Sequence, residues 1–476
     1  MRAALLNPHR ENRPLAALVA LGWLLAAGCG SQPAPSIVLI TVDTLRADAL
    51  DPYRPAQALQ LTPRLAQLAN ESTLFERATA PMPLTRPSHF SIFTGRYPRE
   101  HGVVNNQIAL PDGELTLAEI LQSHGYRTAA FVAVKLLGEG SGAEQGFGSF
   151  AAPRTQLEWP ASEVVARANA WLEAQPQGAP FFLWVHLFDP HQPYDPPAAF
   201  REHLDPALAA QFPVLGWTEL LRIAKQNDGH ISAQIVEHAK ALYRGEVAAV
   251  DLSIGKLLDK LDSLGQRDRT MVVFTADHGE CFERGIYFEH SECLHEGGIR
   301  VPLLVRYPSQ FEPGRRVPNL VSNADIAPTI LRAIGLELPA SISVAPLQES
   351  ETVRDRFVLL QNPFHAEGVL SARLHRQTAI RRIAEEPIDA FDPSVQKVGI
   401  VMGDWKYLRS QKSKELYAVG VAVAAERIAH RRLQGVRSLM DARLDRALER
   451  HPLALIETGA INPELLESLR ALGYVE

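Results

Sequence analysis

Thr85 combines a hydroxyl group with a position at the predicted start of a short helix. Thr85 suits the N-cap, Pro87 the first turn and Gly95 the stop, while Phe90 and Phe93 supply an apolar face. The N–H groups at a helix N-terminus are unpaired and the dipole is positive there, so a tetrahedral oxyanion binds well at such a place. Thr85 is therefore a candidate nucleophile. The alternative is that Thr85 only caps the helix, which is a common use of threonine.

Three apolar runs of the chain each end in polar residues. They are 36–42 with Asp43, 181–188 with Asp189 and His191, and 270–275 with Asp277 and His278. Continuous apolar runs of this length, rich in β-branched residues, are typical of buried parallel strands. Open α/β sheets bind ligands at the carboxyl ends of their strands, so we expect these side chains to meet Thr85 in one site.

Strand and helix patterns alternate over the first two thirds of the chain. Further strands are predicted at 126–134 and 301–305, and helices near 60–70 and at 114–124, 164–174 and 239–264. This alternation predicts an α/β fold, a mostly parallel central sheet with helices on both faces.

The character of the sequence changes beyond about residue 340. Residues 398–408 predict two strands around the turn Gly403-Asp404, and residues 424–448 carry Arg and Leu at helical spacing. We expect residues 36–340 to form the main domain and residues 341–476 a smaller α+β subdomain with a helical tail. A basic helix can lie on a membrane surface, but the interspersed acids favour a solvated face.

The composition is that of a folded globular protein, with 476 residues and a net charge of −6 that gives no reason to expect a nucleic-acid partner. Three arginines precede an apolar segment, 15–27, which has the length of a signal peptide and is too short to favour a membrane span. The segment Leu25-Ala26-Ala27-Gly28-Cys29 is similar to a bacterial lipoprotein cleavage box, although Ala26 stands where Leu is preferred.

These features predict a signal peptide over residues 1–28, a lipid anchor on Cys29 and a linker over 29–35. The body of the protein would then lie outside the cytoplasm, on the periplasmic side of the bacterial cell envelope. An ordinary secretory signal or an uncleaved anchor is the alternative. In such an oxidising compartment Cys281 and Cys293 would pair and close the loop between them, the alternative being two unrelated buried thiols.

The motifs of the chain, taken together, resemble the sulfatase family of the alkaline phosphatase superfamily. Two of them are Thr85-Arg86-Pro87-Ser88-His89 and Thr275-Ala276-Asp277-His278-Gly279-Glu280. The other matching segments, in the order of the family, are 42–46, 94–98, 100–103, 125–128, 189–194, 296–302 and 325–329, with weaker similarity at 405–407 and 415–417. The resemblance implies an alkaline phosphatase/sulfatase-like catalytic domain over 36–340.

The resemblance implies that Asp43, Asp277 and His278 bind a divalent cation that also contacts Thr85. Oxygen ligands with one imidazole suit Zn²⁺ or Mn²⁺, whereas Ca²⁺ or Mg²⁺ would prefer oxygen alone. Such a cation would lower the pKa of the Thr85 hydroxyl, which would attack the ester and give a covalent intermediate that water hydrolyses.

The chain departs from the sulfatase pattern at the position of the nucleophile. Sulfatases place there a Cys or Ser that is oxidised to formylglycine, and threonine cannot form that aldehyde. Arg is replaced by His89, a second acid by Thr44, and the usual amide by His278. The set resembles phosphodiesterases and envelope phosphotransferases of the superfamily that use a metal-bound threonine, which favours phosphate (di)esters over sulfate esters.

The remaining histidines have open roles. His186, Asp189, His191 and His290 are candidates for a second metal site. In the alternative, His191 and His290 protonate the leaving group and hold the non-bridging oxygens. His191 is expected to contact the ester, and His290 to be either a metal ligand or a substrate contact. His89 and Asp189 are expected to bind substrate, whereas His186 fits a core histidine better. Glu292, His295 and Glu296 lie nearby and receive no role. A Cys281–Cys293 disulfide would fix the loop that carries His290.

Four functions remain open on these grounds. The favoured one is a metal-dependent ester hydrolase that acts on a small anionic ester, a glycan or a lipid headgroup. A true sulfatase, an envelope phosphotransferase and a catalytically silent protein that binds anionic glycans are the alternatives. Clustered carboxylates have no physical reason to persist in a dead site, which argues against the last.

Overall fold

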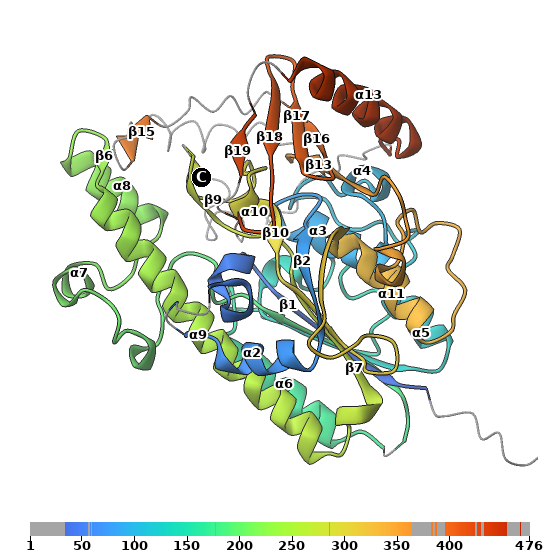
Figure 1. The fold of residues 1–476 in the computed structure, drawn as a ribbon. Coiled ribbons are helices and arrows are strands. Elements are labelled where there is room, and N and C mark those ends of the chain that lie inside the picture. The colour runs from blue at the N-terminus through green and yellow to red at the C-terminus, as the bar shows by residue number, and fades with distance from the viewer. Residues whose placement is uncertain are drawn as a thin grey trace, which may run out of the picture. The chain divides into compact units, whose positions relative to one another are not determined.

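A mostly parallel sheet forms the centre of the computed structural model (Figure 1). The structure describes residues 34–454 and 467, with gaps at 56–57, 59, 177, 285, 364–381, 384–385, 388–395, 424–425 and 430–432. Within these residues the sheet has nine strands, ordered β10-β2-β11-β7-β1-β5-β3-β4, with β12 also paired to β2. The strands are β1 (Ser36–Val42), β2 (Thr73–Thr79), β3 (Arg127–Val132), β4 (Ser149–Ala151), β5 (Phe181–Leu187), β7 (Thr270–Ala276), β10 (Arg300–Val301), β11 (Leu303–Arg306) and β12 (Arg316–Ser322). β10 and β11 alone run antiparallel to their neighbours in this sheet as described.

Helices cover both faces of the central sheet (Figure 1). One layer contains α2 (Pro63–Asn70), α6 (Ala161–Glu173) and the long α9 (Ala233–Ser263), which contacts each of the other two. The other layer contains α3 (Thr85–Thr94), α5 (Leu117–Ser123) and α11 (Ile326–Ala333). Strands β1, β5 and β7 are buried along their whole length because both faces are covered, which explains their unbroken apolar sequences. The predicted fold class is confirmed.

A separate antiparallel sheet follows in the C-terminal part. Its strands, in spatial order, are β13 (Phe357–Gln361), β16 (Val398–Met402), β17 (Trp405–Arg409), β18 (Lys414–Ala418) and β19 (Arg427–Ile428). Helix α13 (Gln434–Arg450) packs on β16 and β17. The hairpin predicted around Gly403 is confirmed, while the domain boundary near residue 340 stays a prediction.

Shorter elements complete the described fold. They are α4 (Pro98–His101), α7 (Pro206–Gln211), α8 (Trp217–Gln226), α10 (Glu296–Ile299), β6 (His230–Ile231), β8 (Cys281–Glu283), β9 (Ile286–Glu289), β14 (Arg382–Ile383) and β15 (Glu386–Pro387). β8 and β9 form a hairpin that precedes α10.

Three predicted boundaries are wrong. The helix predicted over 424–448 begins only at Gln434, and part of that stretch is strand β19. The strand predicted at 301–305 is divided by Pro302 into β10 and β11, because proline cannot donate to a ladder. The N-cap of α3 is Leu84, and Thr85 is the first helical residue.

The predicted signal peptide and Cys29 lie outside the described residues. In the part of the chain that the structure describes, no helix is both long and apolar enough to cross a membrane.

Candidate active site

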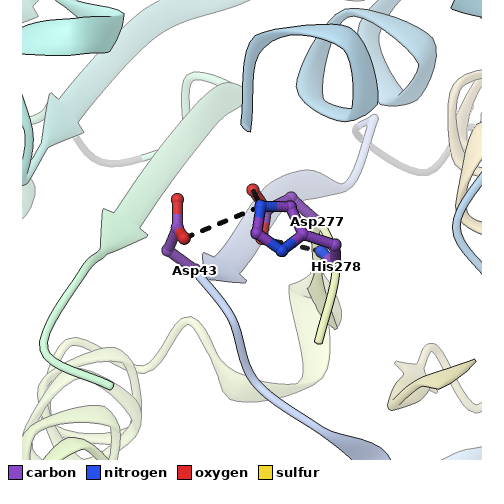
Figure 2. A group of neighbouring side chains, drawn as sticks. All are labelled: Asp43, Asp277 and His278. Atoms are coloured by element: carbon purple, nitrogen blue, oxygen red, sulfur yellow. Dashed lines mark hydrogen bonds and ion pairs between the residues drawn. The ribbon is translucent and has the colours of Figure 1, made fainter. Parts of the chain in front are cut away.

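Asp43 and Asp277 leave the central sheet side by side. Strands β1 and β7 pair in parallel with Val42 opposite Ala276, so the residue after each strand emerges at the same edge. His278 follows Asp277 directly, and one ligand atom from each of these three residues lies within 4.8 Å of the others. Figure 2 shows the two carboxylates and the imidazole turned toward one another. The predicted convergence of these three side chains is confirmed.

The three side chains form a buried cluster of unpaired polar atoms. Both carboxylate oxygens of Asp43, Oδ2 of Asp277 and Nε2 of His278 are buried and have no hydrogen-bond partner within the described structure. Nε2 of His278 lies 3.2 Å from Oδ2 of Asp277 and 3.8 Å from Oδ1 of Asp43. Leaving an ionised carboxylate buried and unpaired costs about 5 kcal/mol of folding free energy or more.

The orientation of the His278 ring fits a cation between these groups. Nδ1 lies 3.0 Å from the carbonyl oxygen of Gly279, an acceptor only, so Nδ1 donates and Nε2 presents a lone pair to the carboxylates. Burial lowers the pKa of His278 to about 3, so the ring is neutral at pH 7. Lone pairs facing carboxylates repel unless a cation joins them, and the residues present therefore fit a divalent metal ion.

The two aspartates differ in their pKa directions. Burial, and then the charge of Asp43, raises the pKa of Asp277 well above its usual value. Burial also works against ionisation of Asp43, but His186 holds the pKa of this carboxyl well below its usual range. Nδ1 of His186 accepts from the N–H of Ala133 at 3.3 Å, so its Nε2 carries the proton and faces Oδ2 of Asp43 at 3.8 Å. His186, expected to be an ordinary core histidine, thus contacts the cluster.

Helix α3 brings Thr85 to the same region of the protein. The hydroxyl of Ser88 donates to the carbonyl oxygen of Asp277 at 2.6 Å, and Asn323 donates to the same oxygen at 2.9 Å. Oγ1 of Thr85 is buried and has no hydrogen-bond partner in the described chain. Because Leu84 and not Thr85 is the N-cap, the threonine hydroxyl is not used to cap the helix.

His89 connects Thr85 with Asp277. Its Nδ1 lies 2.8 Å from the carbonyl oxygen of Thr85 and 3.5 Å from Oδ2 of Asp277, and its Nε2 lies 3.1 Å from the hydroxyl of Thr41. Burial lowers the pKa of His89 to about 3. Both ring nitrogens are thus engaged within the fold, so this geometry favours a positioning role over the predicted contact with substrate.

His290 and His191 form a second group beside the three-residue cluster. The rings of His290 and His278 stack with centroids 4.5 Å apart, and the ring of His191 lies 5.3 Å from that of His290. Nδ1 of His290 lies 3.4 Å from Oε1 of Glu280, whose Oε2 accepts from the hydroxyl of Tyr194 at 3.1 Å. Sequence reasoning assigned no role to Glu280, although its place directly after Asp277-His278-Gly279 was a signal.

The two histidines of this group have opposite pKa directions. Burial opposes protonation of His290, but Glu280 raises its pKa above the usual value. Burial lowers the pKa of His191 despite the charge of Asp43. His290, which the raised pKa favours as a proton donor, therefore lies next to His191, whose lowered pKa favours the neutral ring.

Asp189 does not join the cluster. Both of its carboxylate oxygens accept from the N–H of Ala161, at 3.0 and 2.9 Å, at the start of α6. Asp189 therefore serves the N-terminus of a helix in this structure.

A disulfide joins Cys281 and Cys293, as predicted. It closes the chain segment that contains the β8–β9 hairpin and His290. The end of this segment is also held by Lys406, whose ammonium donates to the carbonyl oxygen of Leu294 at 2.8 Å. The predicted effect of the disulfide on His290 remains to be tested.

The comparisons with known proteins agree with this fold and cluster. Residues 35–336 match the family described as Sulfatase, so the chain belongs to the sulfatase family of the alkaline phosphatase superfamily. It is 28% identical to an ulvan-active sulfatase of Formosa agariphila, over 69% of this chain and 68% of the relative. It is 24% identical to an N-acetylglucosamine-6-O-sulfatase of Bacteroides thetaiotaomicron, over 72% and 76%.

Solved structures show the same fold at low sequence identity. The phosphonate monoester hydrolase of Agrobacterium radiobacter has a TM-score of 0.68 and 19% identity, and the match covers 88% of this chain and 96% of that one. Membership of the family makes the protein a hydrolase of sulfuric or phosphoric esters. Enzymes of the family depend on a metal, consistent with the donor set of Asp43, Asp277 and His278.

Proposed function

We propose that the protein is a metal-dependent hydrolase of phosphate esters in which Thr85 is the nucleophile. The observation that carries this proposal is the Thr85 hydroxyl, buried without a partner in the described chain at the start of a helix that is tied to Asp277. A buried hydroxyl normally finds a hydrogen bond, so an unpaired one on a helix bonded to the Asp277 backbone indicates a ligand.

Asp43, Asp277 and His278 would hold the cation, with Thr85 as a further ligand. When bound, a divalent cation would lower the pKa of the threonine hydroxyl and neutralise charge on the ester oxygens. One imidazole among oxygen ligands favours Zn²⁺ or Mn²⁺.

The residues of this chain then divide the remaining chemistry between them. The Thr85 hydroxyl first gives its proton to solvent, and the resulting alkoxide attacks the phosphorus atom in line. The P–O bond to the leaving group breaks, and the oxygen of the leaving group takes a proton from His290. His191 binds a non-bridging oxygen. Water then attacks the phosphorus atom on Thr85, and His290 takes a proton of this water. The bond between Thr85 and phosphorus breaks, which returns the Thr85 alkoxide and releases phosphate from a monoester or a phosphate monoester from a diester. Glu280 holds the ring of His290 during both steps.

The single hydroxyl of threonine supports phosphate over sulfate esters. In the hydrate of formylglycine one hydroxyl group carries the sulfate, and the other expels it by losing a proton and forming the aldehyde again. A threonine ester has no second hydroxyl group and must be cleaved by water at the phosphorus or sulfur atom. The names of the similar proteins include both chemistries, namely sulfatases and a phosphonate monoester hydrolase. Sulfate ester hydrolysis is therefore the second candidate.

A panel of chromogenic substrates tests the proposal. Purified protein would be analysed for bound metal and assayed on phosphate monoesters, phosphate diesters and sulfate esters. We expect phosphate ester turnover that is lost in Thr85→Ala and retained in Thr94→Ala, a buried threonine at the other end of α3 whose hydroxyl donates to the Phe90 carbonyl at 2.6 Å. Faster turnover of sulfate esters by the wild-type protein would overturn the preference, and an active Thr85→Ala would overturn the nucleophile.

We also propose that Cys29 carries a lipid and that the enzyme works on the periplasmic side of the cell envelope. The Cys281–Cys293 pair supports this because disulfides persist in oxidising compartments. Labelling of cells with a fatty-acid analogue should mark the wild-type protein and not Cys29→Ser. An unlabelled wild-type protein in the cytoplasmic fraction would contradict the proposal.

A further inference from the structure

A cavity of 360 Å³ lies between α13 and the segment that leads into β13. It is separate from the candidate active site, since none of the residues described for that site lines it. Tyr97, which lines the cavity, follows helix α3 in the chain. Thr85 is at the opposite end of this helix, whose ten residues span about 15 Å. Five arginines line the cavity: Arg354, Arg356, Arg443, Arg446 and Arg450.

The positive charge of this cavity exceeds the negative charge that the fold supplies. Arg356 pairs with Asp325, and Arg443 pairs with Asp355 at 3.0 Å. The other three arginines of the cavity have no carboxylate within 4.0 Å among the described residues. In addition, Nη1 of Arg356 is buried without a hydrogen-bond partner in the described chain.

Helix α13 uses two of its acids to bind the neighbouring sheet. Its acids Asp441 and Asp445 bind Arg409 of the neighbouring strand β17, at 2.8 and 2.7 Å. Asp441 also binds Lys414 of β18 at 2.6 Å. Asp441 and Asp445 are therefore paired with the sheet and do not neutralise the arginines of the cavity. The cavity arginines of α13, namely Arg443, Arg446 and Arg450, lie one or two helical turns apart.

Like charges at this spacing repel and destabilise a helix unless an anion lies between them. Arg443 and Arg446 are three residues apart and Arg446 and Arg450 are four apart, which are the spacings of neighbours on a helix surface. Guanidinium groups present planar forks of N–H donors that match phosphate and sulfate oxygens. The cavity therefore has the composition of an oxyanion site.

The volume and the lining of the cavity restrict the class of ligand further. A volume of 360 Å³ is at the lower end of the range for small-molecule sites, about 300–1,000 Å³, and suits one sugar ring with one ester group. Tyr97, Val353 and Phe357 add apolar wall against which a ring can pack. We propose that this cavity binds a sugar unit that carries a phosphate or sulfate ester, as a site apart from the catalytic one.

The proposal does not depend on Thr85 or on the metal, and its test separates the two sites. The full-length protein would be titrated with glucose 6-phosphate, glucose 6-sulfate, inorganic phosphate and uncharged glucose, with a metal chelator present so that the esters are not hydrolysed. Hydrogen exchange of residues 434–450 locates binding at the cavity, because ligands at the catalytic site leave this helix unprotected. We expect both sugar esters to protect the helix, and glucose to leave it unchanged.

The variant Arg446→Ala/Arg450→Ala tests the residues. Both side chains are exposed and alanine favours helix, so the variant should fold, which a thermal melt checks. We expect its affinity for the sugar esters to fall about tenfold or more. Arg437→Ala is the matched control, since Arg437 lies on α13, donates to the Lys414 carbonyl at 3.4 Å and does not line the cavity.

Activity on a small chromogenic phosphate ester should be unchanged in the double variant. Equal ester affinity in the wild-type protein and the double variant would overturn the site. Binding of inorganic phosphate as tight as that of the sugar esters would overturn the assignment of a sugar ligand. Neither result would affect the proposed role of Thr85, which the substrate panel tests separately.

Discussion

Two buried clusters of charged residues in this protein differ in one respect, the pairing of their polar atoms. In the first, Lys406 donates to the Leu294 carbonyl and pairs with Glu296 at 3.3 Å and with Glu426, so its three N–H groups have three acceptors. In the second, Asp43, Asp277 and His278 present polar atoms that have no partner among the described residues.

The difference separates a structural charge cluster from a ligand site. Both clusters are fully buried, and both join segments that are distant in the sequence. The Lys406 cluster is satisfied by the protein itself and connects the C-terminal sheet to α10. The aspartate cluster has no cationic lysine or arginine side chain paired with it among the described residues, and a bound divalent cation would supply the missing positive charge. Burial of charge alone would not have distinguished them.

Replacing a member of the unpaired cluster should have the largest effect on activity. In Asp277→Asn we expect the rate to fall about a thousandfold or more, because a ligand of the cation is weakened. The free energy of unfolding of the metal-free variant should equal or exceed that of the metal-free wild-type protein, because one of two adjacent buried acids is gone. Kinetic assays and urea titrations measure both. A marked loss of stability would contradict the comparison.

Removing a member of the paired cluster should do the reverse. Lys406→Met removes the ammonium that joins Glu296 and Glu426, which keep only their contacts with Arg300 and with Arg284 and His295. We expect about 1–3 kcal/mol less stability to urea, because buried carboxylate oxygens lose a hydrogen-bond partner. The nearby surface variant Lys412→Met is the control and should change stability by about 0.5 kcal/mol at most. A Lys406→Met protein of wild-type stability would mean that the pairing contributes little.

Metal should stabilise only the protein with the intact aspartate cluster. At a Zn²⁺ or Mn²⁺ concentration one hundred times the Kd, the wild-type protein should gain about 2.7 kcal/mol. The same addition should leave Asp43→Asn nearly unchanged, and a chelator should reverse the gain. Differential scanning calorimetry follows the shift. An equal shift in both proteins would place the metal elsewhere.

The two clusters also differ in how well the sequence predicts them. The strand-end residues Asp43, Asp277 and His278 were predictable, because parallel strands of one sheet have their carboxyl ends at the same edge. Glu280 and Lys406 were not predictable as partners. Their contacts join positions 10 and 110 residues apart, as His290 with Glu280 and Lys406 with Glu296, and depend on tertiary packing.

The boundaries that sequence reasoning missed have local causes. Residues 427–428 fit a helical pattern but pair with β18, since an available strand edge outweighs a weak helical preference. The two ends of β2 gain partners from β10, β11 and β12, all of which come more than 200 residues later in the chain. No periodicity in the sequence reports such pairings.

The Lys406 cluster should also make part of the free energy of unfolding depend on pH, so that it is lost in acid. Burial works against ionisation of Glu426, but Lys406 lowers the pKa of this carboxyl well below its usual value of about 4.5. Because the folded-state pKa is depressed, the contribution is complete above about 4.5 and is lost as the pH falls through the folded-state pKa. Urea titrations below pH 4.5 should show a shallower loss in Lys406→Met than in the wild-type protein. Parallel pH profiles would contradict this assignment.

The disulfide should have the smallest effect on the rate. In Cys281→Ser/Cys293→Ser we expect a decrease of about three- to tenfold, because the loop with His290 is held less firmly while Glu280 still binds its ring. The pH profile of the rate should shift if His290 is displaced. An unchanged rate and profile would show that α10 and Lys406 suffice to hold the loop.

The central claim, that Thr85 is the nucleophile, is tested most directly by trapping the covalent intermediate. The enzyme would be mixed with a phosphate diester, quenched with acid within the first turnover and digested, and the peptides analysed by mass spectrometry. We predict a phosphoryl or phosphodiester group on Thr85, absent without substrate and absent in Thr85→Ala. A modified residue other than Thr85, or turnover with no modified peptide, would contradict the mechanism.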